Sequence, residues 1–150
     1  MYKATTIAKW FVAWAEEENA DLSNLKLQKL LYYAQGWALR ETGQPLFRER
    51  ICAWSHGPVV PEVYHQFKRF GSGDIRLAET DDFQWVDVDA DATTLLIKVW
   101  NTYAGYSAWG LRNMTHAEPP WRNHFEPDAY NPEIPNDEIR EFFRSLPERV

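Results

Sequence analysis

Apolar side chains recur at helical spacing between Leu25 and Glu41. Their separations of three or four positions are typical of one side of an α-helix. The residues on this side are Leu27, Leu30, Leu31, Ala34 and Ala38. Beside them lie Gln28, Tyr32 and Gln35, also at helical spacing. A helix needs only its apolar side to pack, so this second, hydrogen-bonding edge indicates a partner inside the protein or outside it.

Other segments repeat this spacing and bring the expected number of helices to about six. They cover residues 4–18, 61–70, 93–104, 108–115 and 136–146. Ser23 or Asn24, Asp91 and Ser107 precede three of the expected helices, and their side-chain oxygens can accept a first-turn N–H. Gly43 follows the helix that begins near Leu25 and is expected to end it.

The β content predicted from the sequence is small. Residues 51–54 are expected to form a short strand, followed by a turn over 55–58. Residues 83–89 alternate partly between apolar and polar positions, which favours a strand or half of a hairpin. The segment that begins at 119–121 is expected to be irregular. The sequence therefore predicts a mainly α fold over 1–150, a compact single domain with a small β element near 51–54 and 83–88.

Composition narrows the classes of partner. The 150 residues carry a net charge of −6, which makes non-specific nucleic-acid binding unfavourable and suits a basic protein partner. Eight Trp, seven Tyr and eight Phe provide both core and binding anchors. No apolar run reaches the roughly 20 residues of a membrane span, and no secretory signal is evident. A single cysteine and these absences favour a cytoplasmic protein.

Two groups of residues deserve comparison with metal sites. The acids of 87–91 begin like a calcium-binding loop, but the sixth position is not glycine and the twelfth is lysine. His116, Glu118 and His124 include ligand types, but two prolines intervene and no tight histidine pair is present. No metal or other cofactor is expected, and His116 is expected to form a hydrogen bond inside a corner where its helix ends and Trp121 packs.

Cys52 and His56 are the one candidate pair for thiol chemistry. They flank a tryptophan on an expected strand and turn, with no glycine elbow and no dense basic cluster to activate the thiol. We expect a buried, inert cysteine and a protein that is not an enzyme.

Three motifs in order carry a family resemblance. They read LKLQKLLYYAQG at 25–36, AWSHGPVVPEVY at 53–64 and THAEPPW at 115–121, with PLF at 45–47 between the first two. Together they resemble the SocA-like antitoxin domain, also called the Panacea domain, over about 4–143. One departure is Ser55-His56, which stands where an aromatic residue often precedes the Gly-Pro pair.

The resemblance implies an antitoxin that neutralises a cognate toxin protein by direct binding. One branch of the family acts instead as an adaptor that delivers its toxin to a AAA+ protease. Many other members are phage-associated, which leaves binding of a host enzyme as a further alternative. No nucleic-acid or membrane partner is expected.

The motif residues admit two interpretations. They form a rigid shelf that anchors a toxin, or they only hold the helices together. The candidate partner-binding or motif residues are Lys26, Gln28, Lys29, Tyr32, Tyr33, Gln35, Trp54, His56, Gly57, Pro58, His116, Glu118 and Trp121.

Overall fold

The computed structural model describes residues 1–77 and 81–147. Its α-helices in this part of the chain are α1 (Ala4–Glu17), α2 (Asn24–Thr42), α3 (Pro61–Phe67), α4 (Ala90–Tyr103), α5 (Ala108–His116), α6 (Pro119–Arg122) and α7 (Asn136–Ser145). The strands are β1 (Ile51–Trp54), β2 (Gly57–Val59) and β3 (Glu133–Ile134). Two 3₁₀ turns, η1 (Lys68–Phe70) and η2 (Trp85–Asp87), complete these elements. The mainly α fold with a small β element is confirmed.

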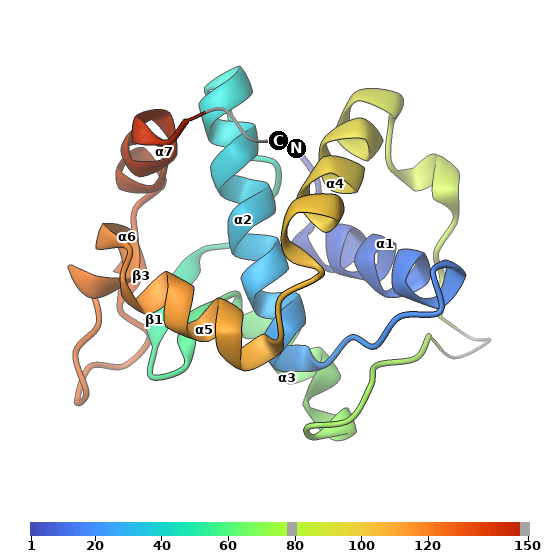
Figure 1. The fold of residues 1–150 in the computed structure, drawn as a ribbon, viewed down its shortest axis with the longest axis horizontal. Coiled ribbons are helices and arrows are strands. Elements are labelled where there is room, and N and C mark those ends of the chain that lie inside the picture. Colours follow the sequence, from blue (N-terminus) through green and yellow to red (C-terminus); the bar gives the residue numbers. More distant parts are fainter. Residues whose placement is uncertain (78–80, 148–150) are drawn as a thin grey trace.

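Helix α2 is the central element of the fold. It runs through the middle of the molecule and contacts α1, α3, α4, α5, α7 and β2 (Figure 1). Every residue from Leu27 to Leu39 is buried. A helix enclosed on all sides buries its polar residues too, so those side chains require partners within the fold.

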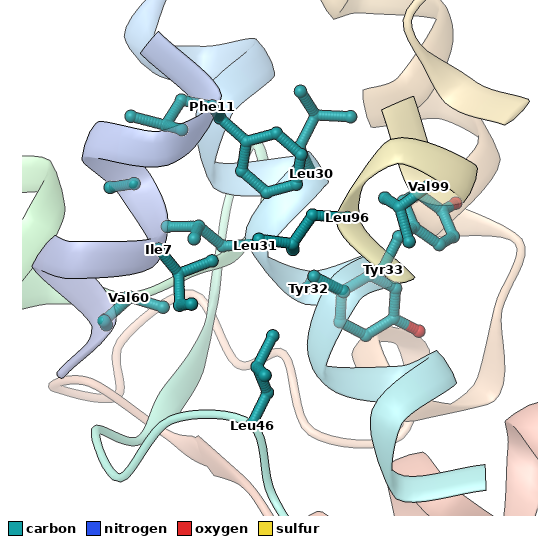
Figure 2. Close-up of a cluster of buried hydrophobic side chains, with 14 of the residues drawn as sticks. Ile7, Phe11, Leu30, Leu31, Tyr32, Tyr33, Leu46, Val60, Leu96 and Val99 are labelled. Carbon is teal, nitrogen blue, oxygen red and sulfur yellow. The ribbon is translucent and has the colours of Figure 1, made fainter. Parts of the chain in front are cut away.

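The hydrophobic core lies where α1 and α4 pack against α2. Figure 2 shows side chains of all three helices meeting there, including Ile7, Phe11, Leu30, Leu31, Leu96 and Val99. Each of these side chains is fully buried. Burial of one such side chain stabilises the fold by roughly 1.5–3 kcal/mol, so this contact fixes the position of α2.

The helix ends follow local capping chemistry. Ser23 Oγ accepts the Lys26 N–H at 3.2 Å, which makes Ser23 the cap of α2. Gly43 ends α2 with φ of 76°. The expectation that Asp91 caps the fourth helix was wrong: α4 begins at Ala90, and Asp89 Oδ1 accepts the Ala92 N–H at 2.8 Å.

The small sheet has the strand order β2-β1-β3, with both pairs antiparallel. The strand at 51–54 is confirmed, but the expected strand near 83–88 was wrong. Residues 85–87 form η2, in which Asp87 Oδ2 accepts the Gln84 N–H at 2.9 Å. The segment at 119–121 is helical rather than irregular, because proline fits the first positions of a helix, where its missing N–H has no partner to lose.

Within 1–77 and 81–147, no helix combines the length and apolar character needed to cross a bilayer.

Candidate functional site

The polar edge of α2 faces the interior of the protein. Gln28 and Gln35 are each at most 1% exposed. Gln28 Oε1 accepts the Val60 N–H at 2.9 Å, and its amide donates to Asn24 Oδ1 at 2.9 Å. Gln35 Oε1 accepts the Leu46 and Phe47 N–H groups at 2.8 and 3.1 Å, and its amide donates to the Phe47 carbonyl at 3.0 Å. The two glutamines therefore hold the segments that follow α2 and β2 in place.

Glu118 completes a buried network at the N-terminus of α6. Its carboxylate accepts hydrogen bonds from the Tyr32 and Tyr33 hydroxyls, each at 2.9 Å. Burial raises the pKa of Glu118 to about 7, against the opposing effect of the two tyrosine bonds. Burial also raises the pKa of both tyrosines, so they stay protonated donors.

The network extends through an aromatic stack to α4. The Tyr33 ring stacks on Tyr103 with centroids 3.9 Å apart. The Trp37 indole N–H donates to the Tyr103 hydroxyl at 2.9 Å. Burial raises the pKa of Tyr103 to about 12. These contacts connect α2, α4 and the N-terminus of α6.

Lys29 is a fully buried residue of α2, one helical turn before Tyr32 and Tyr33. Its Nζ donates to the Pro58 carbonyl at 2.9 Å. Burial, with a smaller effect from Arg112, lowers its pKa to about 7. Gly57 has φ of +109°, and a Cβ there would lie 2.6 Å from Lys29 Cε and 2.8 Å from Thr115 Oγ1. The Gly-Pro pair therefore leaves the space that Lys29 occupies.

The His116–Trp121 corner joins α5 and α6 to the sheet. The His116 ring stacks on Trp121 with centroids 3.7 Å apart, as expected from the sequence. The Trp121 indole donates to the Trp54 carbonyl at 2.7 Å, and the Trp54 indole donates to Asn131 Oδ1 at 2.9 Å. Burial lowers the pKa of His116, which favours its neutral ring.

Among the candidate residues, His56 is exposed, and Lys26 is half-buried with its Nζ bonded to the Ala104 carbonyl. Arg112 Nε lies 3.4 Å from His56 Nδ1, and the Arg112 guanidinium lies 4.2 Å from the centroid of the Trp109 ring. Trp109 is 54% exposed. We call His56, Trp109 and Arg112 the turn surface, because they gather at the turn between β1 and β2.

Trp109 and Arg112 were not predicted as site residues. The signal was their spacing of three on the short helix after Ser107, whose buried side carries Leu111 and Thr115. Residues at this spacing are neighbours on one side of a helix, so the sequence could have predicted a Trp–Arg pair there.

The residues considered for catalysis or metal binding do not converge. Cys52 is buried, and burial raises the pKa of its thiol, which disfavours the nucleophilic thiolate. His124 pairs with Glu138 at 2.9 Å, whereas Glu118 is held by the two tyrosines. Over the described ranges, no three His, Cys, Asp or Glu side chains are placed to hold a metal ion.

Comparison with known proteins agrees with the three motifs. Residues 27–122 match the family described as "Antitoxin SocA-like, Panacea domain". The chain is also 41% identical over 68 residues to "Antitoxin SocA" of Caulobacter vibrioides (strain NA1000 / CB15N), an alignment that covers 45% of this chain and 36% of that protein. The matched region thus spans about a third of the length of that relative, and no solved structure matches. Because the family match extends over more than half of the sequence, the chain belongs to the SocA-like antitoxin, or Panacea, domain family.

Proposed function

We propose that this protein neutralises a cognate toxin by binding it directly through the turn surface, without catalysing a reaction. The observation that carries the proposal is the family match over residues 27–122, joined by the likeness to a protein named Antitoxin SocA. The buried thiol of Cys52 is in keeping with a binding role.

The choice of surface follows from what the motif residues already do. The side chains of Gln28, Gln35 and Lys29 form their hydrogen bonds with partners inside the fold. The turn surface, in contrast, offers a half-exposed tryptophan, an arginine stacked on it and an exposed histidine. Trp and Arg are the residue types most enriched among side chains that dominate binding energy.

The turn surface is also rigid, which favours binding. Lys29 and Pro58 fix the backbone beneath His56, and Ser107 Oγ caps α5 by accepting the Gly110 N–H at 2.9 Å. A preorganised surface loses little conformational entropy when a partner binds. The toxin is expected to dock on this surface as a folded protein, and the net charge of −6 favours a basic toxin.

Co-expression tests the proposal. Open reading frames adjacent to the gene are expressed alone and together with this protein, and growth is measured. We expect one to arrest growth alone and to be harmless with the wild-type protein. Trp109→Ala with Arg112→Ala is expected to lose protection, whereas Val86→Ala, at a residue of η2 that is 89% exposed, is expected to retain it.

The fate of the toxin separates direct neutralisation from delivery to a AAA+ protease. A toxin that stays at full level while its activity is blocked supports masking. A toxin that disappears only when both this protein and the protease are present contradicts masking and supports the adaptor role. If no adjacent gene product is toxic alone and harmless with this protein, the antitoxin role itself is contradicted.

A further inference from the structure

An aromatic corner forms where α1 ends against η2. The rings of Trp14 and Trp85 lie 6.1 Å apart at an interplanar angle of 88°, so they make two perpendicular walls. Trp85 is 43% exposed although it belongs to a cluster of rings. We call Trp14, Glu17, Glu18 and Trp85 the α1 corner. Together they line an open hollow of about 450 Å³.

The walls of the corner are held by other rings. Trp10, fully buried, stacks on Trp14 with centroids 5.0 Å apart and meets Trp85 edge-on at 6.2 Å. The rings of Phe83 and Trp85 also meet edge-on, with centroids 5.4 Å apart. Gln84 and Asp87 cap each other across η2, which fixes the backbone at Trp85. Because these contacts hold Trp85 in place while it remains exposed, the hollow exists before any ligand arrives.

The charge around the corner is negative. Glu17 and Glu18 follow Trp14 by three and four positions, which puts both carboxylates on its side of α1. The C-terminal end of a helix is itself the negative end of the helix dipole, where Lys, Arg or His is favourable. Helix α1 has no basic residue in its last turn, and neither carboxylate forms an ion pair with any residue in 1–77 or 81–147.

We propose that the α1 corner binds an arginine side chain presented by a partner protein. A planar guanidinium stacks on a tryptophan face through a cation–π contact and donates to a carboxylate through two parallel hydrogen bonds. Trp14 and Trp85 supply the aromatic faces, and Glu17 and Glu18 supply the carboxylates. A cation bound there also reduces the repulsion between the two glutamate carboxylates and the negative C-terminal end of α1.

The chain already uses this contact with its own arginines. The guanidinium of Arg40 lies 5.1 Å from the centroid of the Trp37 ring, and that of Arg112 lies 4.2 Å from the Trp109 ring. Among the described residues, no arginine or lysine makes such a contact with Trp14 or Trp85. The α1 corner thus resembles these pairs with the arginine supplied from outside.

The α1 corner is separate from the turn surface. Helix α1 ends toward the right of Figure 1, whereas α5 and the β1–β2 turn lie toward the lower left. Binding at the corner therefore does not depend on the antitoxin role, and the two can be tested independently.

The test uses small arginine probes with the whole protein labelled with ¹⁵N. Nα-acetyl-arginine N-methylamide is titrated while the indole N–H signal of Trp85, assigned by its loss in Trp85→Leu, is followed by NMR. We expect the signal to shift and saturate. The citrulline analogue, which is neutral and nearly isosteric, is expected to bind at least about three-fold more weakly, because it lacks the charge that cation–π and ion-pair contacts need.

Matched variants locate the contribution of charge. The double variant Glu17→Gln with Glu18→Gln is expected to weaken binding of the arginine probe by about three-fold or more at low salt, because it removes both negative charges. Both residues are exposed, so the variant is expected to fold normally. Glu126→Gln, at an exposed residue far along the chain, is expected to leave affinity unchanged. An unmoved Trp85 signal, equal binding of citrulline, or no effect of the double variant would overturn the proposal.

A lysine probe tests the choice of arginine. Nα-acetyl-lysine N-methylamide is expected to bind more weakly, because an ammonium cannot stack in a plane or bridge two oxygens in parallel. Equal or tighter binding of lysine would overturn the arginine assignment. Loss of toxin neutralisation with normal arginine binding would count against the turn surface and not against the α1 corner.

Discussion

The buried polar residues of α2 and the exposed turn surface lie next to each other but have opposite relations to solvent. Gln28, Lys29 and Gln35 are at most 1% exposed, and each bonds to backbone that follows α2 or β1. Trp109 is 54% exposed, and the polar contacts of Arg112 are with His56 and Asn113. The two regions meet at the β1–β2 hairpin, where Lys29 donates to the Pro58 carbonyl and Arg112 contacts His56. A motif can thus be specific because most of its residues build a support, while the surface combines one motif residue, His56, with Trp109 and Arg112 from outside the motifs.

The difference has an energetic consequence. Removing a buried side chain that bonds to backbone leaves those backbone groups unpaired, which costs about 1–3 kcal/mol for each group. Replacing an exposed side chain removes contacts that solvent can replace, so the change is usually within about 0.5 kcal/mol. Substitutions in the two regions should therefore separate stability from binding.

The largest effect is expected for Gln35→Ala. The change leaves the Leu46 N–H and both backbone groups of Phe47 without their partners. We expect a loss of about 4 kcal/mol in the free energy of unfolding, measured by urea denaturation. Gln44→Ala, at an exposed glutamine on the same segment, is the matched control and should change stability by less than about 0.5 kcal/mol. Equal effects of the two variants would contradict the buried role of Gln35.

The next effect is a pH dependence at Glu118. Burial raises the pKa of this carboxyl from 4.5 to about 7, so between these pH values the folded protein holds a proton that the unfolded chain has released. Its contribution to stability is therefore present below pH 4.5 and is lost as pH rises through 7. Because one pKa unit corresponds to about 1.4 kcal/mol, the loss amounts to about 3 kcal/mol.

Glu118→Gln removes this titration and is the test. We expect the variant to gain stability relative to wild type between pH 4.5 and pH 8, by about 3 kcal/mol in urea denaturation. Glu126→Gln is the exposed control and should follow the wild-type profile. A constant difference between Glu118→Gln and wild type across this range would show that Glu118 does not carry the raised pKa.

Much of the fold was readable from the sequence because α-helices follow local rules. Helical spacing predicted α1 to α5 and α7, and Ser23 and Ser107 cap α2 and α5 as expected. The parts of the fold that the sequence did not predict depend on contacts between residues far apart in the chain. Residues 83–88 alternate like a strand, but Trp85 turns instead to meet Trp10 and Trp14 of α1. Strand β3 has two residues, and its partner β1 lies about 80 positions earlier.

The sequence predicted which residues belong to the candidate site better than it predicted what those residues do. The motif residues near Gln28 and Glu118 do gather around α2, but whether a polar edge faces a partner or the interior depends on which elements enclose it. Three separate segments, around Phe47, Pro58 and Glu118, bond to side chains of α2, and no local sequence pattern predicts that enclosure. Trp109 and Arg112 lie outside the motifs, so the motifs did not predict them as site residues.

A smaller effect on stability, with a large effect on binding, is expected for Trp109→Ala. The side chain contacts His56 and Arg112 at the surface, so we expect less than about 1 kcal/mol of lost stability. Affinity for the toxin is expected to fall by about 2 kcal/mol, roughly 30-fold, which titration calorimetry would measure once the toxin is identified. Affinity that Trp109→Ala leaves as unchanged as the control Val86→Ala does would show that the toxin binds another surface.

The smallest effect is expected for Arg112→Lys, which keeps the charge of the turn surface but changes its shape. Lysine cannot stack as a plane on Trp109 or reach His56 with a fixed donor, so the three side chains lose their mutual orientation. We expect stability to stay within about 0.5 kcal/mol of wild type and toxin affinity to fall by about 1 kcal/mol. If Arg112→Lys instead destabilised the protein as strongly as Gln35→Ala, the turn surface would belong to the support, and the contrast between the two regions would fail.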